Sequence, residues 1–257
     1  DDTAGTIRAA QSLHAQAACE NLFMKIPGTP AGLPAIEACI YEGVPINVTL
    51  LFSREQTMAA ADAILRGIER RIAAGRPPVV EAVLSLFVSR WDVAVHDTVT
   101  PALRNRLGIA VSMLAYKAWR DLLASRRWQG LEAAGAHAPR MLWASTGTKD
   151  PAAPPLLYVE ALAAPGTIDT MPDKTLAALA QAERIGAPMP DDGGHAEDVL
   201  AEFRREGVDD EALAERLQRE GGESFAKSWG QLMGGLQRKI DKVNGSVGTK
   251  VAQAALH

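Results

Sequence analysis

The alternation of short apolar segments with longer amphipathic ones is the feature that most constrains how this chain can fold. Apolar segments of strand length lie at 21–26, 44–50, 81–86 and 140–144, with a weaker one at 166–170. The segments between them place apolar residues at helical spacing, as crossovers between parallel strands require. The pattern therefore predicts an α/β protein with five parallel strands. Its sheet is either open and doubly wound, or part of a barrel whose first three βα units would precede Asp1.

Helix signals fall between these strands and continue to the end of the chain. Ser53 followed by Gln56 is typical of a capping box at a helix start, and Gly43 is typical of a helix end. Helices are expected at about 6–18, 30–42, 53–74 and 103–128, from 172 onward, and in the tail at 196–206, 209–220 and 223–243.

Bulk composition narrows the classes of partner and cofactor. The chain has 257 residues and a net charge of -4, which argues against nucleic acid as a partner because no surplus of cations can neutralise phosphates. The two cysteines, Cys19 and Cys39, indicate a reducing compartment. No apolar stretch approaches the length of a membrane span, so neither a span nor a signal peptide is expected, and the predicted location is cytoplasmic.

The spacing of the chemically reactive side chains predicts no cofactor. The five histidines are scattered and form no metal-binding motif, so no metal site is expected. No glycine-rich fingerprint follows a predicted strand, which argues against a dinucleotide site.

Lys25 is the charged residue of the apolar segment 21–26. Strand alternation places Phe23 and Lys25 on one face of the strand and Met24 and Ile26 on the other. If Lys25 is buried, its ammonium form is disfavoured, its pKa falls, and its amine becomes a nucleophile able to form a Schiff base with a carbonyl. In the alternative, its stem reaches from the strand end to solvent.

Polar side chains also lie near the carboxyl ends of the next three predicted strands. They are Asn47 and Thr49, Ser85 and Arg90, and Ser145 and Lys149. Each has a plainer interpretation: a local hydrogen bond, a cap, or, for Arg90, a surface ion pair with Asp92. In a parallel α/β barrel, however, such strand ends converge on one mouth, where active sites are built. Together with Lys25, the set predicts a site at that mouth.

Several segments resemble the signatures of the transaldolase family. They are residues 22–29 (LFMKIPGT), 43–53 (GVPINVTLLFS), 85–90 (SLFVSR), 142–151 (LWASTGTKDP), 158–160 (YVE) and 166–172 (GTIDTMP). The third is similar to the family's Ser-Pro-Phe-Val-x-Arg phosphate motif, with Leu86 in place of the proline. The likeness extends over essentially the whole chain and is greatest to the longer bacterial branch.

The resemblance implies a (β/α)8 barrel that transfers a dihydroxyacetone unit between sugar phosphates in the pentose phosphate pathway, from sedoheptulose 7-phosphate or fructose 6-phosphate. Lys25 would form the Schiff base and Thr49 would hold the catalytic water, with Asn47, Ser85, Arg90, Ser145 and Lys149 binding substrate. Residues 1–194 would be a partial barrel domain containing strands four to eight, and residues 195–257 a helical extension packed on it.

The same resemblance leaves three functions open. The family takes an Asp from its first strand and a Glu from its third, and both strands would lie before Asp1. The chain could therefore act as a transaldolase, as a Schiff-base aldolase that releases its ketone, or as an inactive sugar-phosphate-binding fragment. Its oligomeric state is not predicted.

Overall fold

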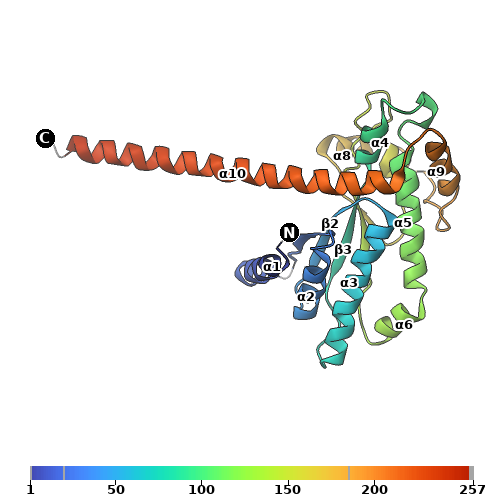
Figure 1. Ribbon diagram of the computed structural model, residues 1–257, viewed down its shortest axis with the longest axis horizontal. Helices are drawn as coiled ribbons and strands as arrows, with labels where there is room; N and C mark the ends of the chain where they lie inside the picture. The colour runs from blue at the N-terminus through green and yellow to red at the C-terminus, as the bar shows by residue number, and fades with distance from the viewer. Residues whose placement is uncertain (1, 20, 185, 255–257) are drawn as a thin grey trace. The chain divides into compact units, whose positions relative to one another are not determined.

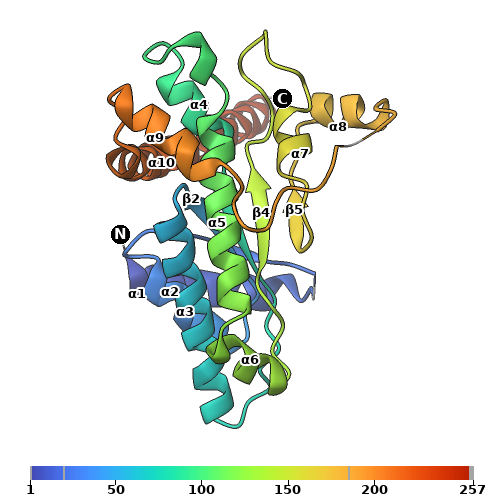
Figure 2. The same cartoon turned by 90° about the vertical axis from the view of Figure 1, so that its right-hand side faces the viewer.

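The computed structural model describes residues 2–19, 21–184 and 186–254, with side chains as far as Val243. Its residues group into two compact units, Asp1–Gln218 and Arg219–His257. The first unit contains a parallel sheet of β1 (Met24–Pro27), β2 (Ile46–Leu51), β3 (Ala82–Phe87), β4 (Arg140–Ala144) and β5 (Thr167–Asp169). The strands lie side by side in chain order (Figures 1 and 2). A doubly wound sheet reverses its strand order, so this alternative is wrong for the described residues.

The helices largely follow the predicted alternation. They are α1 (Thr3–Ala17), α2 (Leu33–Glu42), α3 (Arg54–Ala73), α4 (Ser89–Val95), α5 (Leu107–Leu123), α6 (Arg126–Ala133), α7 (Leu157–Ala161), α8 (Asp173–Ala180), α9 (Ala196–Arg205) and α10 (Asp210–Ala254), with a short 3-10 helix at Pro101–Leu103. Ser53 caps α3 as predicted, because its side chain accepts a hydrogen bond from the Gln56 amide.

Three helix predictions were wrong. The single helix expected at 103–128 is divided between the 3-10 helix, α5 and α6, because Ser125 accepts from the Trp128 amide and starts a new helix. The helices expected at 209–220 and 223–243 are one helix, α10, which continues through Gly221 and Gly222. Two short helices that follow strands, α4 and α7, were not predicted.

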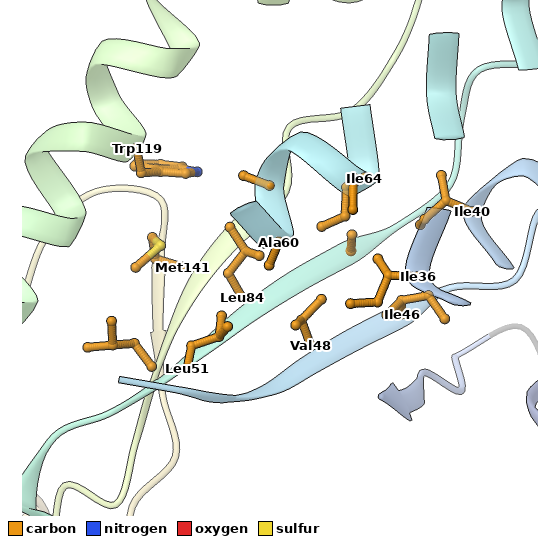
Figure 3. Packing of buried hydrophobic residues seen from close by; sticks show 14 of the residues in the cluster. Ile36, Ile40, Ile46, Val48, Leu51, Ala60, Ile64, Leu84, Trp119 and Met141 are labelled. Carbon is orange, nitrogen blue, oxygen red and sulfur yellow. The ribbon is translucent and has the colours of Figure 1, made fainter. Parts of the chain in front are cut away.

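The main core lies between one face of the sheet and helices α2, α3 and α5. Figure 3 shows Ile46, Val48 and Leu84 of the strands directed toward Ile36 and Ile64 of the helices. Every one of these side chains is fully buried. Full burial of an aliphatic side chain of this size contributes about 1.5–3 kcal/mol, so this face fixes the register of the sheet.

A second apolar cluster lies beyond the carboxyl ends of the strands. It joins Leu50 of β2 and Phe52, which directly follows β2, to Leu107 of α5, Phe203 of α9 and Leu217 of α10. Because α9 and the beginning of α10 take part in this core, they belong to the first unit. The boundary predicted at residues 194 and 195 falls inside that unit.

The second unit is the remainder of α10. Several of its apolar side chains are exposed, Trp229 among them. In the described part of the chain, no helix combines the length and the apolar character needed to cross a membrane.

Candidate active site

Three predicted site residues lie on adjacent strands at one face of the sheet. Lys25 of β1 pairs in register with Asn47 of β2. The Ser85 hydroxyl of β3 donates to the Asn47 side-chain oxygen at 2.6 Å. Their neighbours Met24, Ile46 and Leu84 belong to the core, so alternation turns the polar residues to the opposite face. The structure thus brings Lys25, Asn47 and Ser85 into one row.

Lys25 is exposed, while Met24 and Ile26 on either side of it are buried. The predicted alternation along the strand is confirmed, and of the two states left open for Lys25 the buried one is wrong for the described chain. The reason is geometric, because Met24 and Ile26 point into the core between the sheet and its helices, whereas Lys25 points to the opposite face. The alternative in which the lysine reaches solvent describes this arrangement.

Thr49 lies in an unusual part of β2. Pairing with β1 stays regular from Asn47 to Thr49, whereas pairing with β3 shifts between Val48 and Leu51. Leu50, the residue after Thr49, has a left-handed φ of 58°. The Thr49 side chain is buried and its Oγ1 has no hydrogen-bond partner among the described residues. A buried hydroxyl left in this way costs about 1–3 kcal/mol, which points to a position for a water molecule or a substrate group.

Arg90 is exposed at the beginning of α4, directly after β3. The sequence allowed a surface ion pair between Arg90 and Asp92. This interpretation is wrong, because Asp92 is buried. The Asp92 carboxylate accepts hydrogen bonds from the amides of Leu107 and Gly108 at the start of α5, and from the Tyr158 hydroxyl at 2.9 Å. Asp92 therefore ties α4 to α5 and α7, and leaves Arg90 directed away from the core.

The carboxyl of Asp92 should make the stability of the protein depend on pH. Burial raises its pKa to about 6 from an ordinary 3.8. The folded chain thus holds this proton more tightly than the unfolded chain, so the stabilisation is complete only below pH 3.8 and is lost as pH rises from there through about 6. In urea titrations across this range, Asp92→Asn should remove that part of the pH dependence. A constant difference in unfolding free energy between parent and variant would contradict the assignment.

Ser145 lies at the end of β4 and has a left-handed φ of 60°. Its hydroxyl is 2.9 Å from that of Ser89, and its carbonyl accepts from the Ser89 amide at 3.0 Å. Ser89 begins α4, so these contacts place Ser145 beside the helix start that carries Arg90. The ends of β3 and β4, both predicted to bind substrate, are therefore joined by these hydrogen bonds.

Lys149 lies elsewhere in the loop after β4. It is exposed and lines a cavity of about 250 Å³ together with His96, Asn105, Asp150 and Tyr158. None of the residues that line this cavity is another of the predicted site residues. The substrate-binding role predicted for Lys149 thus rests on its sequence position alone.

Two polar features of the strand ends were missed. The buried Thr146 hydroxyl donates to Asp169 of β5 at 2.6 Å, and burial raises the pKa of that carboxyl. The rule that selected Ser145, a polar residue at a strand end, would also have found Asp169. Gln218 of α10 contacts the ends of β1 and β2, and no local signal in the sequence points to it. No cluster of three or more His, Cys, Asp or Glu side chains suited to a metal ion occurs in the described ranges.

Comparison with known proteins identifies the family. A sequence model of the family described as Transaldolase/Fructose-6-phosphate aldolase matches residues 1–236. A transaldolase of Neisseria meningitidis serogroup A is 39% identical over 233 residues, which are 90% of this chain and 66% of that protein. A transaldolase of Parafrankia sp. is 41% identical over 248 residues, with 93% and 67% covered. The chain spans about two thirds of the length of the relatives it matches. This chain belongs to the transaldolase/fructose-6-phosphate aldolase family.

Proposed function

We propose that this chain carries the Schiff-base site of a transaldolase, which moves a dihydroxyacetone unit from fructose 6-phosphate or sedoheptulose 7-phosphate to an aldose phosphate. The observation that carries the proposal is the row of Lys25, Asn47 and Ser85 on one face of the sheet. Family membership supports it. A role in the pentose phosphate pathway and a cytoplasmic location belong to the same proposal.

The amine of Lys25 would attack the C2 carbonyl of the ketose and release water. The protonated imine then acts as an electron sink, so the C3–C4 bond can break once the C4 hydroxyl gives its proton to a base. The aldose phosphate leaves, and the three-carbon unit remains on Lys25 as an enamine. Attack of this enamine on a second aldose, followed by hydrolysis, completes the transfer.

The other residues would bind and orient the substrate. Asn47 is held by Ser85 at 2.6 Å and can bond a sugar hydroxyl next to the imine. Thr49 has a buried hydroxyl without a hydrogen-bond partner among the described residues, which suits the catalytic water. The guanidinium of Arg90, near Ser145, suits a phosphate dianion, and Lys149 would add a second cation.

The sheet would be the second part of a (β/α)8 barrel, strands four to eight. Consecutive parallel strands in chain order support this assignment, because a barrel wall is built that way. Arg90 and Ser145, which follow β3 and β4, would then lie at the carboxyl ends of the strands, which is the catalytic end of such barrels. Lys25 and Asn47 are the second residues of β1 and β2.

One observation favours a second candidate, an aldolase that releases free dihydroxyacetone. Lys25 is exposed, and an enamine formed on an exposed lysine can be protonated by water before an acceptor arrives. A closed site prevents this side reaction. The two functions share the imine and differ in the fate of the enamine.

Borohydride trapping tests the proposal directly. The chain is incubated with fructose 6-phosphate and borohydride, and its intact mass and peptide map are measured. A three-carbon adduct on Lys25 is expected, because it reports both imine formation and cleavage of the C3–C4 bond. Absence of any adduct on Lys25 would contradict the proposal. With erythrose 4-phosphate present, a seven-carbon product indicates transaldolase, whereas free dihydroxyacetone indicates aldolase.

Thr49→Val should raise the stability of the protein and lower its activity. The change removes a buried hydroxyl that has no partner in the described part of the chain, so the free energy of unfolding should rise by about 1 kcal/mol. Turnover should fall about 100-fold, because the catalytic water loses its anchor. Thermal melting and steady-state kinetics measure the two effects.

Thr57→Val is the matched control for this stability effect. Thr57 is also buried, but its hydroxyl donates to the Ser53 carbonyl at 2.7 Å. Its removal should therefore lower stability by about 1 kcal/mol. Equal losses of stability in the two variants would contradict the assignment of an unpartnered Thr49.

A further inference from the structure

Gln218, the last residue of the first unit, bonds to the ends of both strands that carry the proposed Schiff-base site. Its side chain is almost fully buried. Its amide nitrogen donates to the carbonyl of Gly28 at 3.1 Å and to the carbonyl of Leu50 at 3.0 Å. Gly28 directly follows β1, and Leu50 is in β2. One side chain therefore links the two strand ends.

Both carbonyls belong to neighbours of Thr49. Gly28 also donates its amide to the Thr49 carbonyl at 2.8 Å, and Leu50 is the residue after Thr49. Leu50 is left-handed and lies where the pairing with β3 shifts. A non-glycine residue keeps such a conformation only when its surroundings impose it. The bond from Gln218 to the Leu50 carbonyl is one of those constraints.

Packing holds Gln218 in this position. Leu213, Ala214 and Leu217 in the first turns of α10 belong to the same buried cluster as Leu50 and Phe52. The Gln56 amide donates to the Ala214 carbonyl at 3.4 Å, which adds a second polar link. The first turns of α10 are thereby fixed against the end of β2.

The chemistry of the contact requires an amide. The amide nitrogen of glutamine carries two hydrogens, which matches two carbonyl acceptors. A glutamate carboxylate of the same length can only accept hydrogen bonds and would repel both carbonyls. A methionine has similar length and shape but no donor.

We propose that Gln218 is a positioning residue for the reaction. By holding the Gly28 and Leu50 carbonyls together, it fixes the peptide groups around Thr49, and thus the place of the Thr49 hydroxyl relative to Lys25 on the neighbouring strand. The inference rests on the proposed function, in which Thr49 holds the water that reacts at the imine.

The test compares the full chain with Gln218→Met, Thr49→Val and the double variant. Displacement of a positioned group by about 1 Å can cost about 100-fold in rate. Gln218→Met should therefore lower kcat by about 10- to 100-fold with little change in KM. In the double variant, kcat should fall no further than in Thr49→Val alone, because both changes act on one group. Additive losses would show a general structural effect and overturn the proposal.

Two further variants complete the test. Gln237→Met is the matched control, since Gln237 is an exposed glutamine of α10 whose amide donates to Asp241 of the same helix. It should leave kcat unchanged. Gln218→Glu keeps the polar character of the side chain and removes the donor, so it should reproduce the loss seen in Gln218→Met. Failure of both Gln218 variants to fold would assign a purely structural role and overturn the proposal.

The outcomes distinguish this proposal from the one on which it rests. A parent chain that forms no borohydride adduct and shows no turnover contradicts the proposed function, and the positioning role fails with it. A parent chain with turnover whose Gln218→Met variant keeps the same kcat contradicts the positioning role alone.

Discussion

Replacing Lys25 with arginine is expected to abolish both the borohydride adduct and the turnover. Arginine preserves the positive charge and most of the length of the side chain. Its guanidinium stays protonated at every accessible pH, however, so it offers no lone pair to attack a carbonyl. Loss of a covalent nucleophile costs on the order of 10⁴-fold or more in rate. Turnover of fructose 6-phosphate and the intact mass after trapping measure the two effects.

Lys117→Arg is the control for this change. Lys117 is a partly exposed lysine of α5 whose ammonium pairs with Asp121 at 2.7 Å, and its replacement should leave the adduct and the turnover intact. The exposure of Lys25 makes the control necessary, because exposed amines can react with sugars nonspecifically. Turnover that persists in Lys25→Arg would contradict the assignment of the nucleophile, whereas a nonspecific adduct would also form in a chain without turnover.

The sheet was predictable because few sequence patterns are compatible with a parallel strand. Each strand packs one face against helices and therefore needs a short, largely apolar segment, and such segments alternate here with segments of helix length. The strand predicted at 140–144 coincides with β4. Even the three residues of β5 lie inside the predicted segment 166–170. Errors at the other strands are confined to their ends.

The errors in the helices have a different origin. The break before α6 depends on the hydrogen bond that the Ser125 hydroxyl accepts, and no strong helix-ending signal in the sequence accompanies it. The continuity of α10 through Gly221 and Gly222 runs against the low helix propensity of glycine. Asp92 looks like a surface residue beside Arg90 but caps α5 from inside the fold. Such outcomes depend on distant partners, so a local pattern cannot predict them.

The same distinction applies to the site. Alternation within strands was sufficient to predict that Lys25 lies on the face opposite Met24 and Ile26, where it pairs with Asn47 of the neighbouring strand. It could not predict the left-handed Leu50, because nothing in the residues around it requires the shift in pairing. Nor could it predict Gln218, whose two partners are 190 and 168 residues away in sequence.

Trp143→Ala is expected to destabilise the first unit by about 4 kcal/mol, because removal of a large buried side chain leaves a cavity. Trp143 of β4 is 1% exposed and belongs to the core on the helix-covered face. Its indole nitrogen donates to the carbonyl of Leu162 at 2.9 Å, so the change also leaves a buried acceptor without its donor. For a unit of this size the melting temperature should fall by about 8–16 °C.

Trp229→Ala is the matched control, since Trp229 is 64% exposed on α10 and should change stability by less than about 0.5 kcal/mol. The comparison also separates the two faces of the sheet. Trp143 lies opposite the row that contains Lys25, so its loss should lower the folded fraction on heating without changing adduct formation per folded molecule. A specific loss of the Lys25 adduct in fully folded Trp143→Ala would show that the two faces are coupled and that the tryptophan takes part in the site.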